Sequence, residues 1–384
     1  MTARAGSSNK STSCSAHNPS VGLCCHQVRI GGNLLDTIGE SAAILLVGGV
    51  GGTLLGLAAR LGKFCTLGMV EDAHFGQDFG RMWMWVTALG VAITMNFGAD
   101  ALGYIDLSAT GLLSTRFSVP GALLGGLLFG YGMAQSGNCG YGVLARLGGG
   151  DIRALMIALV MGITATATIF GVLSGIRNGL FPFEPSPGAP QGLAHWVGDA
   201  FGLSANAIGL TVGILALLAS IRFQTTGHRL RRVAWGAVVG VAISSGFIGT
   251  YSIATQGFEP WPIASHTFTA PVGDTIHYAM YSTGLLPKFG IGSVLGVLIG
   301  SVIGSLIQDG FRWEACDDPR ELRRQLAGAA TMGFGAVLAA GCSVGQGLSA
   351  LSMFSATAPL VAVSIWFGAW LGLKHLIYGF ERAT

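Results

Sequence analysis

The sequence predicts an all-α integral membrane protein, and its charge content is the first reason. Only 10% of the 384 residues are charged and 51% are hydrophobic, whereas soluble domains carry about 25% charged residues. Long runs contain no charge at all, and the longest, Gln325–Leu373, can hold two spans. A membrane helix needs about 20 apolar residues, while the strands of membrane β-barrels alternate over about 10. These runs are too long and too uniformly apolar for a barrel.

Net charge and cysteine usage exclude several other classes of protein. The net charge is only +3 and no run of Lys and Arg is dense, so we expect the lipid bilayer as a partner and no nucleic acid. The seven cysteines are odd in number and scattered, which is not typical of a disulfide scaffold. No Ser/His/Asp or H-E-x-x-H constellation is present. We therefore expect no enzyme, no cofactor and no metal site.

About nine transmembrane helices are predicted from the apolar runs. Four segments between them are too apolar for free loops and too short to cross, and each is rich in Gly, Ser or Thr. Non-helical backbone at membrane depth must be surrounded by protein or water, so we expect re-entrant half-helices and loops there. The predicted spans are 40–59, 82–99, 119–136, 152–177, 206–222, 233–250, 289–308, 324–341 and 358–378. The predicted re-entrant segments are 60–81, 137–150, 260–287 and 342–355.

The chain divides into a polar N-terminal tail, residues 1–39, and a single transmembrane transporter domain, residues 40–378. The tail is rich in Ser and Asn and is predicted to be disordered. If the N-terminus is outside and the C-terminus is cytoplasmic, fifteen Lys and Arg residues lie on the inner side and six on the outer side. The positive-inside rule favours this orientation.

An internal repeat divides the transmembrane domain. The pattern G-x-G-x6-C-x2-G occurs around Cys139 and again around Cys342, at a constant offset of 203 residues. A weaker echo relates Cys65 to Thr269. Four spans and one extra separate the two copies, so the second copy is inserted upside down. We expect an inverted pseudo-twofold repeat, which is typical of transporters with a substrate site between the halves. Its parts are repeat one 40–177, the extra span 206–222 and repeat two 233–378.

Cys65, Cys139 and Cys342 each lie at the start of a predicted half-helix. A helix N-terminus presents unpaired N–H groups and the positive end of its dipole, which favours an anion. A neutral thiol adds a weak donor and a polarizable sulfur, so a sulfur or selenium anion is favoured over phosphate. Asn138 and Gln346 are uncharged donors next to these cysteines. The predicted substrate-binding residues are Cys65, Cys139, Cys342, Asn138, Gly140, Gly142, Gly341, Ser343, Gly345 and Gln346.

Packing and metal binding are the alternative roles of these cysteines. Free cysteine is among the most buried residue types, so a lone one is usually structural. The repeat argues against this role for Cys139 and Cys342, whereas for Cys65 the two roles are evenly balanced. Structural zinc needs closely spaced ligand pairs, which these three cysteines lack. Only the tail segment Cys14–His26 offers such ligands, and Cys316 lies in a charged loop.

Three basic residues flank the cysteine segments. Arg60, Lys63 and Arg146 could draw an anion from one face of the protein. For each residue alone, snorkelling of the side chain to the membrane interface is the simpler explanation.

Four motifs surround the cysteines: R-x-G-x-F-C at 60–65, L-F-G-Y-G-M at 128–133 before Cys139, R-L-G-G-G at 146–150, and M-G-F-G at 332–335 before G-C-S-V-G-Q-G at 341–347. With these motifs the sequence resembles the YeeE/YedE family of bacterial inner-membrane sulfur transporters. The resemblance covers about residues 40–378. It rests on two cysteine motifs in the right order, half a protein apart.

The resemblance implies a nine-span, pseudo-twofold fold that is pinched at the middle, and import of thiosulfate as the activity. It implies that Cys65, Cys139 and Cys342 pass the anion along by S–H hydrogen bonds, without a stable covalent intermediate. The sequence departs from the family at Asn138, where glycine is common, so the exact sulfur anion stays open. The alternatives are transport of a selenium species, or a membrane redox or sulfurtransfer protein that carries sulfur as a Cys persulfide. A cytoplasmic sulfur-carrier protein is a further expected partner.

Overall fold

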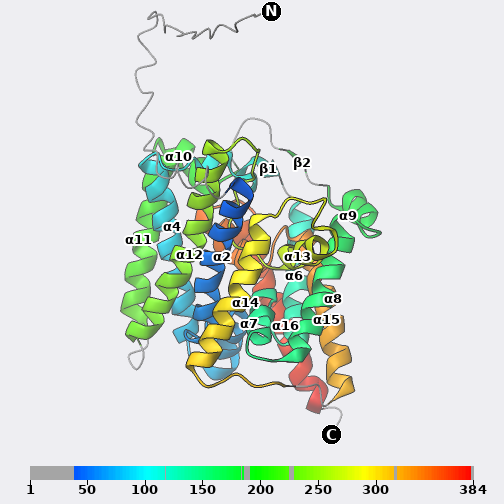
Figure 1. Cartoon of the computed structure of the whole chain (residues 1–384). Coiled ribbons are helices and arrows are strands. Elements are labelled where there is room, and N and C mark those ends of the chain that lie inside the picture. Colours follow the sequence, from blue (N-terminus) through cyan, green and yellow to red (C-terminus); the bar gives the residue numbers. More distant parts are fainter. Residues whose placement is uncertain are drawn as a thin grey trace, which may run out of the picture.

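A computed structural model describes residues 39–116, 118–182, 184–185, 191–224, 229–314 and 318–381. Apart from two short strands, these residues form helices and their connections (Figure 1). The helices are α2 (Glu40–Arg60), α3 (Thr66–Glu71), α4 (Gly80–Ala101), α5 (Gly111–Ser114), α6 (Val119–Ser136), α7 (Gly140–Leu147), α8 (Ile152–Ile169), α9 (Ser174–Leu180), α10 (Leu193–Phe201), α11 (Ala205–Phe223), α12 (Arg229–Gln256), α13 (Thr269–Tyr281), α14 (Phe289–Ile307), α15 (Pro319–Leu338) and α16 (Ala358–Glu381). π-helical turns span Asp72–Gly76 and Gly345–Ala350, and 3₁₀ turns span Leu107–Ala109 and Leu351–Met353.

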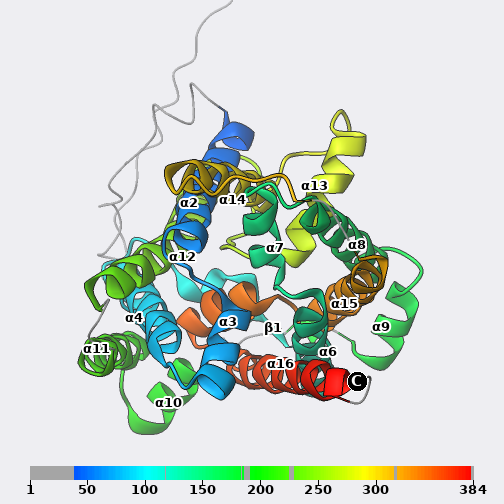
Figure 2. The same cartoon turned by 90° about the horizontal axis from the view of Figure 1, so that it is seen from below.

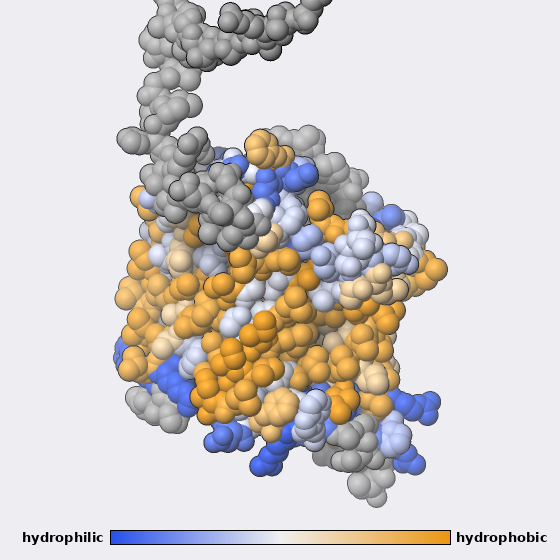
Figure 3. Space-filling model, in the orientation of Figure 1, coloured by the Kyte–Doolittle hydropathy of each residue, from blue (hydrophilic) through white to orange (hydrophobic). Residues whose placement is uncertain are grey.

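The protein is a multi-pass membrane protein. Within the described residues, seven helices are long and apolar enough to cross a membrane, namely α2, α4, α8, α11, α12, α14 and α16. They run side by side in Figure 1, and the face in Figure 3 carries a broad hydrophobic band with hydrophilic residues toward both ends. This arrangement matches a bilayer flanked by water.

The other two predicted spans correspond to α6 and α15, which are less apolar than those seven. α15 begins with the charged sequence Arg320–Arg324, and α6 is rich in glycine. α6 packs against both α15 and α16, and α15 also packs against α8. The approach is close, because a Cβ atom at Gly130 would overlap the backbone of Ile365 and one at Gly335 would overlap that of Phe129. Small residues allow such backbone contacts between membrane helices.

The long helices surround several short ones. Viewed along the helices, α3 and α7 reach toward the interior of the ring that the long helices form (Figure 2). α3 packs on α4 and α16, α7 on α2, α8 and α14, and α13 on α8, α14 and α15. The π-helical turn Gly345–Ala350 packs on α4, α12 and α16. We call the helical segment that contains this turn the 343–353 segment.

Three predicted boundaries are wrong by five residues or more. The span predicted to end at residue 250 continues in α12 to Gln256. The span predicted at 152–177 ends at Ile169 and is followed by the separate helix α9. After this end the Leu173 N–H donates to the carbonyl of Ala167, six residues earlier, so the regular pattern to the fourth preceding carbonyl is broken. Gly171, which lies in this break, is a poor helix former. The span predicted to begin at 324 begins at Pro319, because Asp318 caps it by accepting from the Arg320 N–H at 2.8 Å.

Smaller elements decorate the end at which α2 begins, the upper end in Figure 1. The amphipathic helix α10 was not predicted. Strands β1 (Thr115–Arg116) and β2 (Glu184–Pro185) pair antiparallel. The expectations for the N-terminal tail and for Cys316 concern positions outside the described residues, apart from Gly39.

Candidate functional site

The same backbone turn occurs before each of the three cysteines that lie within the described residues, Cys65, Cys139 and Cys342. A long helix ends, a residue two positions before the cysteine adopts a left-handed conformation, and a short helical segment begins directly after the cysteine. Such a residue commonly ends a helix, because it lets the chain reverse. The three left-handed residues are Lys63, Gly137 and Ala340, with φ angles of 56°, 78° and 54°. The turn places each cysteine at a helix start, where the sequence had located it.

Each cysteine caps the helix that follows it. The sulfur accepts a hydrogen bond from the backbone N–H three residues later, with N···S distances of 3.4 Å for Cys65, 3.5 Å for Cys139 and 3.4 Å for Cys342. The donors of these bonds are Gly68, Gly142 and Gly345. From the sequence we expected the N–H groups at these helix starts to be unpaired. In the structure one N–H group of each helix donates to the cysteine sulfur and is therefore paired. The S–H hydrogen remains free to donate elsewhere.

Polar side-chain contacts bring together the helix starts that carry the three cysteines. The Cys139 thiol points at Thr66 Oγ1, with the two heavy atoms 4.0 Å apart, and Thr66 Oγ1 donates to Ser343 Oγ at 3.3 Å. Ser343 follows Cys342 directly. These contacts join α3, α7 and the 343–353 segment, so three helix starts from distant parts of the chain converge.

The Cys342 sulfur has further contacts from the loop before α13. The backbone N–H of Phe268 donates to it at 3.4 Å, and Thr267 Oγ1 lies 3.4 Å away. The side chain is only 1% exposed. Two backbone N–H groups therefore point at this sulfur, one from Phe268 and one from Gly345.

Cys65 has a polar contact of its own. Its thiol donates to Asn138 Oδ1 with an S···O distance of 3.7 Å, and both residues line a polar cavity of about 350 Å³. Cys65 is partly exposed, whereas Cys139 is 0% exposed. Cys65 thus borders a cavity, whereas Cys139 and Cys342 are buried.

Aromatic side chains pack against one another beside these polar contacts. Phe64 stacks on Trp85 with ring centroids 5.4 Å apart, and Tyr141 lies between Phe64 and Phe268 at 6.4 Å and 5.3 Å. The Tyr141 hydroxyl donates to the carbonyl of Leu55. The rings pack the starts of α3, α7 and α13 together, while Trp85 also lines an apolar cavity of about 180 Å³ with Thr66 and Ser343.

The remaining predicted residues have defined places. Gly140 begins α7, and a Cβ atom there would lie 3.3 Å from Thr269 Oγ1. Gly341 has φ 156°, and a Cβ atom there would lie 3.1 Å from Gln346 Cγ. Gln346 Nε2 donates to the carbonyl of Ala340 at 3.0 Å, so its amide holds the turn before Cys342.

Sequence reasoning missed the polar residues between the cysteines. Thr66 and Thr267 contact the thiols, and His266 is 0% exposed, with Nδ1 2.6 Å from Ser293 Oγ. The repeat offset could have identified Thr66, because α3 begins at Thr66 and α13 at Thr269, again 203 residues apart. The expected echo of Cys65 with Thr269 is therefore displaced by one residue. Thr66 corresponds to Thr269, and Cys65 to Phe268.

The described residues contain no group of three or more His, Cys, Asp or Glu side chains that could hold a metal ion. The metal ligands suggested in the tail lie outside that part of the chain.

Comparisons with known proteins identify the family to which the chain belongs. The profile of a family described as sulphur transport matches residues 61–371. A thiosulfate transporter from Escherichia coli K12, TsuA, is 26% identical over 364 residues, which cover 89% of this chain and 94% of that protein. A thiosulfate transporter of the same name from Spirochaeta thermophila is 23% identical over 326 residues, covering 83% of this chain and 95% of the relative. The resemblance read from the cysteine motifs is confirmed.

Proposed function

The chain belongs to the sulphur transport family, and from this premise we propose that it imports thiosulfate or a closely related sulfur anion through a path lined by Cys65, Cys139 and Cys342. The observation that carries the proposal is that polar contacts bring three cysteine-capped helix starts together. Both relatives described above are named as thiosulfate transporters.

The helix starts themselves favour a divalent anion through their backbone groups. Helix dipoles and the N–H groups of the first turn favour negative charge at these positions. Each sulfur is already an acceptor from a backbone N–H, so its S–H hydrogen is the group that meets the anion. A thiol is a weak and polarizable donor, which suits the terminal sulfur of thiosulfate.

Transport proceeds in this proposal as a sequence of weak sites. The anion passes Cys342, then Cys139, then Cys65, exchanging S–H hydrogen bonds and forming no covalent bond to sulfur. Several weak sites in series allow entry without trapping. Cys342 and Cys139 are 1% and 0% exposed, so the short helices must separate to admit the anion. The remaining predicted residues, Asn138, Gly140, Gly142, Gly341, Ser343, Gly345 and Gln346, shape this path.

We also propose nine spans in an inverted repeat, with α6 and α15 as the two least apolar spans. Packing supports this. At the offset of 203 residues α6 corresponds to α15, α8 to α16 and α3 to α13. The contact of α6 with α16 is then matched by that of α15 with α8, and the contact of α3 with α16 by that of α13 with α8. The parts are those predicted above: 40–177, 206–222 and 233–378.

The proposed orientation places the N-terminus outside and the C-terminus in the cytoplasm of a bacterial inner membrane. α2 ends at Arg60, and α12 begins with Arg229, Arg231 and Arg232, so these arginines share the lower end in Figure 1. The positive-inside rule makes this arginine-rich end cytoplasmic. A cytoplasmic sulfur-carrier protein would receive the anion there.

The test is uptake of radiolabelled thiosulfate into vesicles that contain the purified protein, with unlabelled sulfite and selenite as competitors. We expect saturable uptake that sulfite inhibits weakly. Strong inhibition by selenite would instead support a selenium species as the cargo. Mass spectrometry of the protein after exposure to thiosulfate separates relay from covalent transfer. An unchanged mass is expected, and a gain of about 32 Da, one sulfur atom, on Cys139 or Cys342 would favour a persulfide carrier.

A further inference from the structure

The polar cavity next to Cys65 has an unusual balance of charge. Arg60, Lys63 and Arg81 line it, together with one carboxylate, that of Glu71. The cavity volume is about 350 Å³, which accommodates an oxyanion with several waters, since one water occupies about 30 Å³ of liquid. The lining therefore carries more positive than negative charge.

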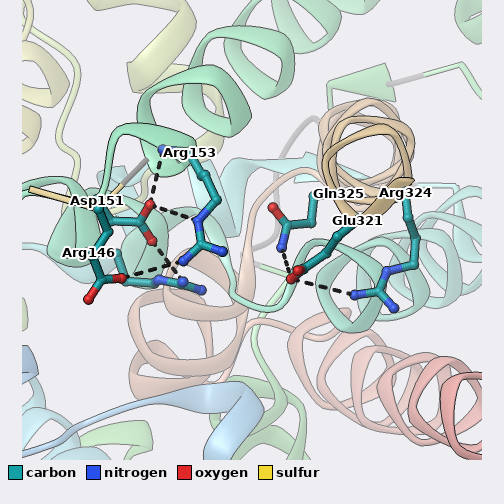
Figure 4. Close-up of polar contacts among 7 residues, drawn as sticks. Arg146, Asp151, Arg153, Glu321, Arg324 and Gln325 are labelled. Carbon is teal, nitrogen blue, oxygen red and sulfur yellow. Dashed lines mark hydrogen bonds and ion pairs between the residues drawn. The ribbon is translucent and has the colours of Figure 1, made fainter. Parts of the chain in front are cut away.

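The basic residues around this end of the protein differ in whether a carboxylate neutralises them. Arg146 lies 2.7 Å from Asp151, and Arg153 lies 3.2 Å from the same carboxylate (Figure 4). Arg232 lies 3.1 Å from Asp78. The backbone N–H of Gly80 and this guanidinium lower the pKa of Asp78, so that carboxylate stays ionised.

Arg60 and Lys63 lack such a partner. Among the described residues no carboxylate lies within 4.0 Å of either charged group. The Nε atom of Arg60 is buried and has no hydrogen-bond partner among the described residues. Arg60 is half-buried and Lys63 is exposed. Buried charged groups are normally paired, so the unpaired Nε of Arg60 retains the capacity to bind an anion, and Lys63 adds an unpaired charge to the lining of the same cavity. Arg81 is paired with Asp72 at 3.2 Å and contributes its remaining N–H groups.

The backbone holds these cations close to the thiol. Lys63 has φ 56°, a conformation that few residues with side chains adopt. A Cβ atom at Gly149 would overlap the Arg60 guanidinium, and one at Gly68 would overlap that of Arg81. Gly68 is the residue whose N–H donates to Cys65. Both guanidinium groups thus lie against the backbone of cysteine-bearing segments.

We propose that Arg60, Lys63 and Arg81 form a second anion site, which binds divalent oxyanions of the sulfate type by charge rather than by thiols. The binding itself is independent of the proposed function. Its role in the cycle rests on that function: thiosulfate leaves Cys65 for this site, and sulfate from the same side competes for it and slows import. Guanidinium and ammonium groups favour oxygen-bearing anions, because their hydrogen bonds are charge-assisted.

Binding is tested by titrating sodium sulfate into the purified protein by calorimetry. The double variant Arg60→Gln/Lys63→Asn removes the two unpaired charges, and Asn is chosen because it tolerates a left-handed backbone. We expect sulfate affinity to fall at least about tenfold, as expected when two charge-assisted hydrogen bonds are lost. Arg320 is exposed and lies outside the cavity, so the control variant Arg320→Gln should bind sulfate as the native chain does. Lys63→Arg keeps the charge and should keep most of the sulfate affinity. Sulfate binding that is absent from the native chain, or unchanged in a folded double variant, overturns the proposal.

A second arm locates the source of the anion and tests the role in transport. Thiosulfate titrated into Cys65→Ala/Cys139→Ala/Cys342→Ala protein should still bind, because the site uses no thiol; loss of this binding would assign the site to sulfate alone and overturn the transit role. Vesicles filled with sulfate should import labelled thiosulfate more slowly than vesicles filled with gluconate at equal ionic strength, and the double variant should lose this difference. Equal rates in both fillings for the native chain contradict the transit role. Absence of uptake in both fillings, with sulfate binding intact, contradicts the proposed function alone.

Discussion

The turns that carry Cys139 and Cys342 share one backbone but have different surroundings. Both place a left-handed residue two positions before the cysteine, and both cysteines accept from the N–H three residues later. Each turn has an amide side chain beside its cysteine. At Cys139 this side chain is that of Asn138, which accepts from Cys65 and lines the polar cavity. Around Cys342 the matching position is Gly341, and the amide comes from Gln346 on the following helix.

This difference separates what the two turns share from what is specific to each. The shared features are the helix start, the thiol and the backbone donor, which are the parts that the relay needs. The specific features set access: the Cys139 side adjoins a basic cavity, whereas Cys342 is surrounded by neutral groups such as Thr267 and Phe268. If the proposed repeat and relay hold, this difference between the two ends would give the transport path a direction.

The largest predicted effect concerns the shared feature. Cys139→Ala and Cys342→Ala should each lower thiosulfate-dependent growth or uptake at least about 100-fold, because each removes one of the sites in series, and this loss corresponds to about 3 kcal/mol in the transport barrier. Cys316→Ala provides a control cysteine outside the membrane runs. If one turn tolerates alanine and the other does not, the two turns are not equivalent, and the relay in series is wrong.

The next prediction exchanges the specific residues of the two turns. Gly341→Asn should lower uptake at least about tenfold, because its Cβ would press on Gln346 Cγ at 3.1 Å with φ at 156°. Asn138→Gly should retain uptake within about threefold, since only the weak contact with Cys65 is lost. Size-exclusion profiles in detergent establish that both variants are folded. A large loss of uptake in folded Asn138→Gly would assign this amide a direct role with the anion.

A smaller effect is expected from the hydroxyl groups at the matched helix starts. Thr66→Val removes the group that joins Cys139 to Ser343 and should lower uptake about tenfold, since loss of one buried hydrogen bond costs about 1 kcal/mol or more. Thr269 Oγ1 is buried and has no hydrogen-bond partner among the described residues, so Thr269→Val should change uptake less than threefold. Equal losses in both variants would argue that the hydroxyl chain is not part of the path.

The smallest prediction compares the two left-handed residues themselves. Gly137→Ala places a side chain at φ 78° in an otherwise open position, with the nearest atom 3.8 Å away, and should cost about 1 kcal/mol of stability. Ala340→Gly should relieve the same strain at φ 54°. Melting temperatures in detergent should therefore move in opposite directions. Movement in the same direction would show that packing, rather than backbone strain, dominates at these turns.

The sequence predicted most of the fold, because membrane helices are specified by composition. All seven helices that meet the length and hydropathy criteria lie at predicted positions, and the cysteines lie at helix starts as expected. The start of α15 depended on an aspartate cap, which hydropathy does not register.

The candidate site was less accessible to sequence reasoning, since its contacts join residues far apart in the chain. Thr66 meets Ser343, and Cys65 meets Asn138, across many intervening residues. A hydropathy pattern or a sequence motif describes one segment of the chain at a time. Such patterns therefore located the cysteines but not the residues from other segments that contact them. His266, buried beside Ser293, left no local pattern at all.

The most direct test of the relay is the initial rate of radiolabelled thiosulfate uptake into vesicles that contain Cys139→Ser, Cys342→Ser or the native chain. Serine keeps a donor at each helix start but replaces the soft sulfur with a harder oxygen. If neutral thiols recognise the terminal sulfur of the anion, both serine variants should transport at least about tenfold more slowly than the native chain while remaining folded. Rates equal to that of the native chain would contradict the account, because the helix starts alone would then suffice.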